Sequence, residues 1–580
     1  MTITSTPFRL ALTRFGAGNN GLALLPLLVS GLHREVQPLP IAPLPLDPLA
    51  PGYPSTPTDP AHRKVVAVVY DDSLLLTPAS ISISPLSGKI VAVVATVLPK
   101  TSFPSSTTYI DYGSKLLIPG LVDAHVHLNE PGRTEWEGFN TGTRAAASGG
   151  VTTVVDMPLN AIPPTTTLAG FNEKLKASRG QCWVDVGFYG GVIPGNANEL
   201  LPLVEAGVRG FKGFLIESGV EEFPAISSAD IELAMKTLNG TPTTLMFHAE
   251  MIPPITDSVG DAVQSSEPPL APKGTLKEYQ TFLDSRPPSF ETYAIEEIIS
   301  LAHLATNLHL HIVHLSATQA IPILKEARKS GINITAETCF HYLGLAAEGV
   351  EDGDCRYKCC PPIREQLNQD GLWEELQAED SCIKTIVSDH SPCTPELKLL
   401  PPHIQTMSTR PSMHLHHSDS GVDMRADLDL APKLLPVLGE GDFFAAWGGI
   451  SSVGLGLPIL HSSSKKRALA GLKSAPSIVD IVRLCSQATA KQVGLSHRKG
   501  ALRVGMDADI CVFDDAEEWT LKSGGMHWKN RCSPWEGHHF TGRVKETWLR
   551  GQKVYEHGGA NAGFVGRKPV GEAIIEKRIA

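Results

Sequence analysis

Two histidines separated by one residue stand at the end of a predicted buried strand, and this feature constrains the chain most. Residues 115–122 form an apolar run that predicts a strand ending at Asp123, and His125 and His127 follow it. In an extended chain, residues two apart point to the same side. Both imidazoles can therefore face one point, as zinc and similar metals require. Taken alone, the pair fits a metal site and a polar strand end equally well.

The middle of the chain alternates short apolar runs with helical segments, which predicts a parallel α/β layout. Helices are expected between the runs, for example over 136–148 and 291–306. Eight β/α units close into a TIM-type (β/α)8 barrel, whose chemistry lies at the carboxyl ends of the strands. We therefore predict this fold class. The eight predicted strands are 117–124, 152–156, 183–188, 210–215, 244–248, 308–314, 332–336 and 383–389.

Short β-branched runs on both sides of the barrel region predict a second, smaller structure. They occur at 65–70, 79–84 and 88–94, and again at 500–513 and 544–555. Because turn residues separate them, they are typical of strands. We expect both chain ends to form one small β-sandwich, with the barrel inserted between them. The predicted parts are a disordered or targeting extension (1–62), the two parts of the sandwich (63–117 and 496–560), the barrel (118–495) with an insertion (399–441), and a C-terminal tail (561–580).

The charge balance excludes two classes of partner. The net charge of −11 argues against binding to nucleic acid or to an anionic membrane surface. The sequence also contains no apolar run of the ~18–20 residues that a membrane span needs. We therefore predict no nucleic-acid partner and no membrane partner.

Cysteine usage and the N-terminus bear on the compartment. Ten cysteines in 580 residues do not form a disulfide framework, which favours a reducing compartment such as the cytoplasm. Residues 1–34 carry Arg9, Arg14 and Arg34 and no acidic residue, so a mitochondrial presequence is the alternative. We expect a cytoplasmic protein unless residues 1–34 act as that presequence.

Side chains that can bind a metal stand at or near the ends of several predicted strands. A lysine among them would repel divalent cations as an ammonium ion. A lysine kept neutral by burial can instead react with carbon dioxide to give a carbamate, whose two oxygens can bridge two metals. The ordered set predicts a metal centre better than any single member does. Its members are His125 and His127 (first strand), Lys212 (fourth), His248 (fifth), His314 (sixth) and Asp389 (eighth).

Several short segments between about 64 and 560 match one family of enzymes. They are Gly120–His127, Glu130–Arg133, Trp136–Gly138, Gly142–Ala147, Asp156–Asn160, Gly210–Lys212, Cys360–Arg364, Val387–Cys393 and Ala446–Ile450. On these segments the chain resembles the cyclic amidohydrolases of the amidohydrolase superfamily, and the allantoinases among them in particular. The combination is highly specific.

The resemblance implies a fold, a reaction and a cofactor. It implies a homotetramer that hydrolyses a small-molecule ureide, opening the hydantoin ring of allantoin to allantoate in purine catabolism. Asp389 is the candidate catalytic residue, taking a proton during attack and returning it to the departing ring nitrogen; a role as ligand only is the alternative. The implied cofactors are two divalent metal ions, zinc first, and carbon dioxide. The implied ligands are His125, His127 and Asp389 on one ion, His248 and His314 on the other, and N6-carboxylated Lys212 across both.

Asn129, Asn160 and Cys360 are the candidate substrate-binding residues. Dihydroorotases of this type carry an arginine where this chain has Asn129, and that arginine clamps a substrate carboxylate. Asparagine can hydrogen-bond a neutral ureide but cannot form the charged clamp, although Arg133 leaves a dihydroorotase open. Dihydropyrimidinase or hydantoinase activity is a further alternative. Some dihydropyrimidinase relatives have lost their metal ligands and act as assembly proteins, but all the ligand positions are kept here.

Overall fold

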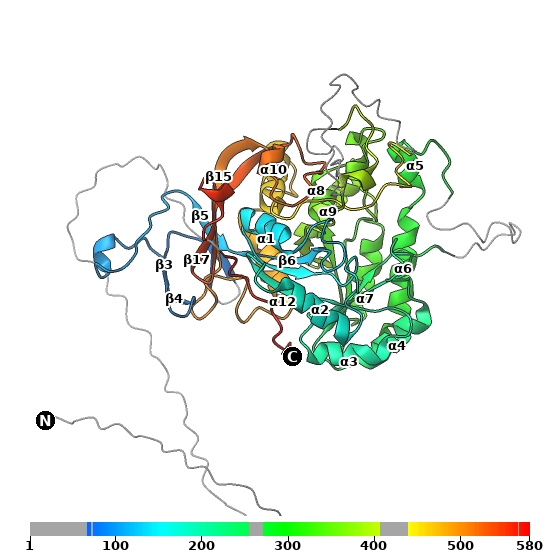
Figure 1. Ribbon diagram of the computed structural model, residues 1–580, viewed down its shortest axis with the longest axis horizontal. Helices are drawn as coiled ribbons and strands as arrows, with labels where there is room; N and C mark the ends of the chain where they lie inside the picture. Colours follow the sequence, from blue (N-terminus) through cyan, green and yellow to red (C-terminus); the bar gives the residue numbers. More distant parts are fainter. Residues whose placement is uncertain (1–66, 71–72, 254–270, 406–438, 567, 580) are drawn as a thin grey trace, which may run out of the picture. The chain divides into compact units, whose positions relative to one another are not determined.

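The computed structural model describes residues 67–70, 73–253, 271–405, 439–566 and 568–579 (Figure 1). The predicted extension 1–62 and most of the predicted insertion 399–441 lie outside these residues. Within the described part of the chain, no helix has both the length and the apolar character needed to cross a membrane.

The central strands are parallel and follow one another in chain order. One sheet has the order β6-β7-β8, and the other runs from β9 to β14. Only Tyr189 separates β8 from β9, and Val126 of β6 bridges His390, just beyond β14, in parallel. These links confirm the predicted TIM-type barrel. The strands are β6 (Leu121–Val126), β7 (Val151–Asp156), β8 (Asp185–Phe188), β9 (Gly190–Gly191), β10 (Phe211–Phe214), β11 (Thr244–His248), β12 (His309–Ile312), β13 (Ile334–Cys339) and β14 (Ile383–Val387).

Helices connect the strands and cover their outer side (Figure 1). They form where one face is apolar: α4, for example, buries Ile231, Met235 and Leu238. Its first turn is fixed by a capping box between Ser227 and Asp230. The α-helices are α1 (Phe139–Ser148), α2 (Leu168–Ser178), α3 (Ala197–Glu205), α4 (Ser228–Leu238), α5 (Tyr279–Asp284), α6 (Pro288–Leu301), α7 (Ala320–Lys329), α8 (Phe340–Gly344), α9 (Gln366–Gln377), α10 (Gly456–Leu469), α11 (Ile478–Val482) and α12 (Ala488–Gln492).

A four-stranded sheet combines the two ends of the chain. Its order is β17-β16-β15-β5, and β5 pairs antiparallel with β15, from Leu116 opposite Phe513 to Pro119 opposite Ile510. Figure 1 shows β5 beside β15, although they are distant in sequence. Two antiparallel pairs, β1-β2 and β3-β4, precede β5. The strands are β1 (Ala67–Tyr70), β2 (Ser73–Leu76), β3 (Ser80–Ile83), β4 (Ile90–Val94), β5 (Leu116–Pro119), β15 (Ile510–Thr520), β16 (His539–Leu549) and β17 (Gln552–Glu556).

The single strand predicted over 117–124 is divided in the structure. Its first part is β5, which belongs to the four-stranded sheet, and its second part is β6, which pairs in parallel with β7. Only Gly120 separates them, and a Cβ there would lie 2.2 Å from Thr152 Oγ1. The sequence did not show the division, because both parts are buried and the apolar run is continuous.

A buried lysine links the start of β8 with the segment that leads into β15. The Nζ atom of Lys499 lies 2.7 Å from Asp185, 3.0 Å from Asp507 and 2.6 Å from Asp509. Its side chain is fully buried, so the ammonium balances carboxylates that water does not reach. Lys499 therefore joins the barrel to the β-rich part of the fold.

Replacing Lys499 by methionine should lower the free energy of unfolding by about 3–5 kcal/mol, because buried carboxylates then lose their cation. Calorimetry should show a lower melting temperature. Lys325→Met is the control, since Lys325 pairs with the largely exposed Asp380 and the more buried Glu375 on the outer side, and we expect a smaller shift. Equal melting temperatures for the two variants would show that the Lys499 cluster does not hold the fold together.

Candidate metal centre and active site

A cavity of about 390 Å³ lies at the carboxyl end of the barrel strands. His127, Lys212, His248, His314 and Asp389 all line it. The sixth predicted ligand, His125, is fully buried and lies against Lys212 and Asp389. The structure thus brings together all six residues that the sequence singled out, although they come from distant parts of the chain.

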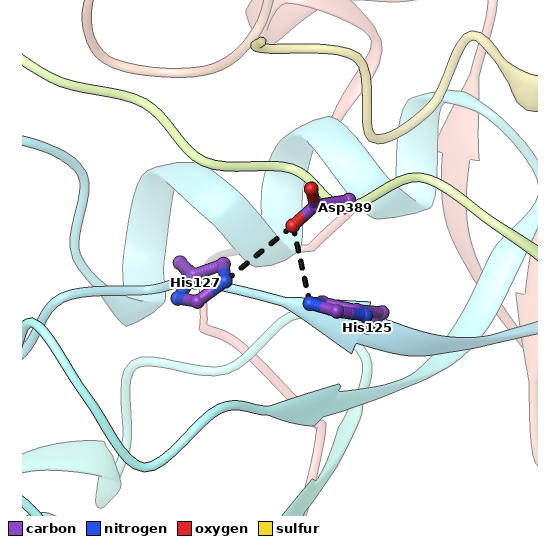
Figure 2. A group of neighbouring side chains, drawn as sticks. All are labelled: His125, His127 and Asp389. Atoms are coloured by element: carbon purple, nitrogen blue, oxygen red, sulfur yellow. Dashed lines mark ion pairs between the residues drawn. The ribbon is translucent and has the colours of Figure 1, made fainter. Parts of the chain in front are cut away.

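The first group of ligand atoms consists of His125, His127 and Asp389 (Figure 2). The Oδ1 atom of Asp389 lies 3.1 Å from Nε2 of His125 and 3.4 Å from Nε2 of His127. Figure 2 shows both imidazoles, from the end of β6, turned toward the carboxylate. Although burial opposes it, the neighbouring His125 and His127 hold the pKa of Asp389 well below its usual range. Asp389 is therefore an ionised carboxylate, as a metal ligand must be.

The second group consists of His248 and His314, with Lys212 between the groups. Nδ1 of His248 lies 3.0 Å from Nε2 of His314, and Nζ of Lys212 lies 3.2 Å from Nε2 of His125. Burial lowers the pKa of Lys212 to about 8, against the opposing effect of the Asp389 and Glu337 carboxylates. Part of the Lys212 population is then a neutral amine near neutral pH, the form that reacts with carbon dioxide.

Two buried glutamates, which the sequence reasoning missed, orient two of the imidazoles. Oε1 of Glu337, on β13, lies 2.5 Å from Nδ1 of His125, and Oε2 of Glu250 lies 2.7 Å from Nε2 of His248. Arg286 holds Glu250 at 2.8 Å. Despite burial, Arg286 and His248 hold the pKa of Glu250 at about 2. Each carboxylate accepts the N–H of its candidate ligand imidazole and leaves the other nitrogen of that ring free for the site.

A sequence signal existed for one of these glutamates. Glu250 stands two residues after His248, the spacing that joins His125 to His127. Glu337 lies in the middle of β13 and reaches His125 of β6, a contact between distant strands that local sequence does not reveal.

The donor set fits two divalent cations. Imidazole nitrogens and carboxylate oxygens favour zinc and its neighbours. In the first group the ligand atoms all lie within 4.8 Å of one another, and in the second two ring nitrogens converge. As an ammonium, Lys212 would oppose cations at this place, whereas a carbamate would offer two more oxygens. The residues therefore fit a dinuclear site only with Lys212 modified.

The three predicted substrate-binding residues differ in their positions. Asn160 and Cys360 line the cavity, and the amide of Asn160 lies 3.4 Å from Nδ1 of His127. Asn129 is buried and donates to the carbonyl of Pro392 (3.3 Å); it is not among the residues lining the cavity. Contact of Asn129 with a substrate stays a prediction.

Arg133 is engaged by other protein groups and does not line the cavity. It forms an ion pair with Glu222 and donates to the carbonyl of Asn160 at 2.8 Å. It is not among the residues lining the cavity, which leaves it poorly placed to clamp a substrate carboxylate. This position weakens the dihydroorotase alternative.

Cys339 and His341 place further potential ligand atoms within 4.8 Å of Asp389. Both residues are fully buried, and neither lines the cavity. They are therefore not part of the cavity wall that a substrate can contact.

Two lysines hold the chain segment 444–449 along one wall of the cavity. Nζ of Lys358 donates to the carbonyls of Phe444 (2.9 Å) and Ala446, and Nζ of Lys398 donates to those of Trp447 (3.1 Å) and Gly449. The backbone of this segment therefore depends on two buried ammonium groups for its position.

Lys358→Met should raise KM roughly tenfold, because charge-assisted hydrogen bonds that position the wall are lost. The kcat value should change less, since Lys358 touches none of the six ligand residues in the described contacts. Steady-state kinetics with the preferred substrate measures both constants. Lys325→Met serves as the control. An unchanged KM in Lys358→Met would show that segment 444–449 keeps its position without Lys358.

Comparisons with known proteins place this site in a family. Sequence models described as Amidohydrolase family match residues 116–372 and 460–555. The chain is 44% identical over 507 residues to allantoinase from Saccharomyces cerevisiae, covering 86% of this chain and 96% of that protein. It is 41% identical over 428 residues to "Allantoinase, mitochondrial" from Aquarana catesbeiana, covering 74% and 75%.

Solved structures agree with the sequence comparison. L-hydantoinase (dihydropyrimidinase) from Arthrobacter aurescens superimposes with a TM-score of 0.68 at 25% identity, covering 88% of this chain and 99% of that one. The barrel, the converging ligand residues and the extent of the 44% identical match lead to the same conclusion. The chain belongs to the allantoinase family of the amidohydrolases.

Proposed function

We propose that this chain hydrolyses the hydantoin ring of allantoin to give allantoate, in the breakdown of purines. Water adds to a ring carbonyl carbon, the ring C–N bond breaks, and the released nitrogen gains a proton. The observation that carries the proposal is the convergence of His125, Lys212 and Asp389 at the base of one cavity. The identity of 44% to an allantoinase over most of both chains supports the choice of ring.

The site would hold two metal ions, and we propose zinc. Bound there, such ions lower the pKa of water and polarise the carbonyl to be attacked. We propose that Lys212 carries carbon dioxide as N6-carboxylysine and joins the two positions. His125, His127 and Asp389 would hold one ion, and His248 and His314 the other.

Asp389 is the residue proposed to move the proton. Its carboxylate is ionised and lines the cavity, so it can take a proton from the attacking water and deliver it to the departing ring nitrogen. His125 and His127 fix the carboxylate on one side. Asn160 and Cys360, with segment 444–449, form the walls within which the ring is oriented.

Hydantoinase or dihydropyrimidinase activity is the second candidate, because the solved structures that superimpose carry those names. These structures are 21–25% identical to the chain, whereas the named allantoinases reach 44%. A non-catalytic assembly role is disfavoured, because all six ligand positions are kept and meet in space.

Purified protein loaded with zinc should be assayed with allantoin, dihydrouracil, a substituted hydantoin and dihydroorotate. We expect the highest kcat/KM with allantoin and none with dihydroorotate. A higher value with dihydrouracil or the hydantoin would replace the proposed function by the second candidate. No turnover of any ring, with two metals bound, would favour an assembly role.

We further propose a homotetramer that acts in the cytoplasm, unless residues 1–34 direct it to mitochondria. The resemblance to the family supports the tetramer, and the ten cysteines, all free in the structure, suit a reducing compartment. Native mass spectrometry of the full chain measures the assembly and its metal content. Imaging of the full chain beside a chain lacking 1–34 tests the compartment.

A further inference from the structure

Beneath the metal-binding residues, polar side chains form an unbroken hydrogen-bonded series inside the barrel. Oε2 of Glu337 lies 3.1 Å from Nε2 of His311, whose Nδ1 lies 2.7 Å from Oγ1 of Thr335. The same hydroxyl lies 2.8 Å from Nε2 of His309. His309 and His311 are two residues apart on β12, and so are Thr335 and Glu337 on β13, so each pair shares a face of its strand. The series thus runs along two adjacent strands.

The series ends at opposite ends of the barrel. At the cavity end, Glu337 meets His125 at 2.5 Å. At the other end, Nδ1 of His309 lies 3.2 Å from Oγ1 of Thr244, the first residue of β11. Nη1 of Arg578 donates to the same hydroxyl at 3.1 Å. The series therefore connects the C-terminal segment of the chain with a predicted metal ligand.

One placement of protons gives every bond in the series a single hydrogen. Arginine only donates, so Thr244 accepts from Arg578 and donates its own proton to Nδ1 of His309. The His309 proton is then on Nε2 and points at Thr335, which in turn donates to Nδ1 of His311.

The second half of the series fixes the metal ligand. His311 carries its proton on Nε2 and donates it to Glu337, which also accepts from Nδ1 of His125. Both His309 and His311 are neutral in this arrangement, and burial, which lowers the pKa of His309 to about 3, agrees with it. With a metal ion bound, Nε2 of His125 would carry no proton and would serve as the ligand atom; it lies beside Lys212 and Asp389.

We propose that Thr244, His309, Thr335, His311 and Glu337 are positioning residues that hold His125 in the Nδ1–H form and couple Arg578 to the metal centre. The inference rests on the proposed function in one respect, since it takes His125 as a metal ligand. Among the described contacts, only Glu337 touches a ligand residue, and the others act through it.

The test compares two threonines of the same strand. Thr335→Val keeps the shape of the side chain and breaks the series, whereas Thr338→Val removes a hydrogen bond to the carbonyl of Leu315 (3.0 Å) outside it. With the zinc-loaded full chain, we expect Thr335→Val to release metal to a chelator about fivefold faster than the parent. Thr338→Val should release metal at the parent rate. Thr335→Ser, which keeps the hydroxyl, should also release metal at the parent rate. Glu337→Gln should release metal roughly 10–100-fold faster.

Nitrogen-15 NMR of the histidine rings in the metal-free chain gives a second readout. It should show His309 and His311 each protonated on Nε2, with a change at both rings in Thr335→Val. Equal metal release from Thr335→Val and Thr338→Val, or a proton on Nδ1 of His311, would overturn the proposal. Neither measurement uses allantoin, so a chain that opens another ring would refute the proposed function and leave this inference standing.

Discussion

Replacing Lys212 by methionine should lower kcat/KM for allantoin by about 10³-fold or more, because the two metal positions would lose the group proposed to join them. Methionine has similar length and is apolar, so the fold should survive at this buried position. Native mass spectrometry should show fewer than two metals per subunit. The parent protein should carry the extra mass of one carbon dioxide, which the variant lacks.

The control for Lys212 is Lys499→Met, which also removes a buried ammonium but lies away from the cavity. That variant should lose stability while its folded fraction keeps both metals. If Lys212→Met bound two metals and opened the ring at the parent rate, the dinuclear proposal would be wrong.

Asp389→Asn should lower kcat by about 10²–10⁴-fold, the usual contribution of general acid–base catalysis. The amide oxygen can still face a cation, but the amide cannot accept a proton from water. Metal analysis separates the two roles considered for Asp389. If Asp389→Asn binds two metals but turns over little substrate, Asp389 transfers the proton. If the variant loses one metal, Asp389 acts as a ligand.

The control for Asp389 is Asp380→Asn, since Asp380 is largely exposed and pairs with Lys325 on the outer side of the barrel. We expect parent kinetics from it. Nearly normal turnover by Asp389→Asn would exclude Asp389 as the proton carrier.

The barrel was predictable because its strands are buried on both faces and stand out as short apolar runs. The predicted strand 244–248 matches β11, and 383–389 contains β14. The convergence of the six candidate ligands was predictable for a related reason: parallel strands bring their carboxyl ends to one edge, so order along the chain becomes proximity in space.

Other features of the site could not be predicted, because they depend on contacts between distant strands. Glu337 reaches His125 across the barrel interior, and no spacing in the sequence links positions so far apart. Likewise, Lys358 and Lys398 hold segment 444–449 through backbone carbonyls, which every residue has and no sequence pattern marks. The division of the run 117–124 at Gly120 was hidden because both sides are equally apolar.

The junction at Gly120 limits where a truncated or chimaeric version of this protein can begin. β5 is held by β15 in one sheet, and β6, which leads to His125 and His127, starts one residue later. A displacement of the four-stranded sheet that contains β5 would therefore shift β6 and the two imidazoles. A fragment that begins at β6 would lack the pairing of β5 with β15 next to its candidate metal ligands, so chimaeras of related enzymes should exchange β5, β6 and β15 together.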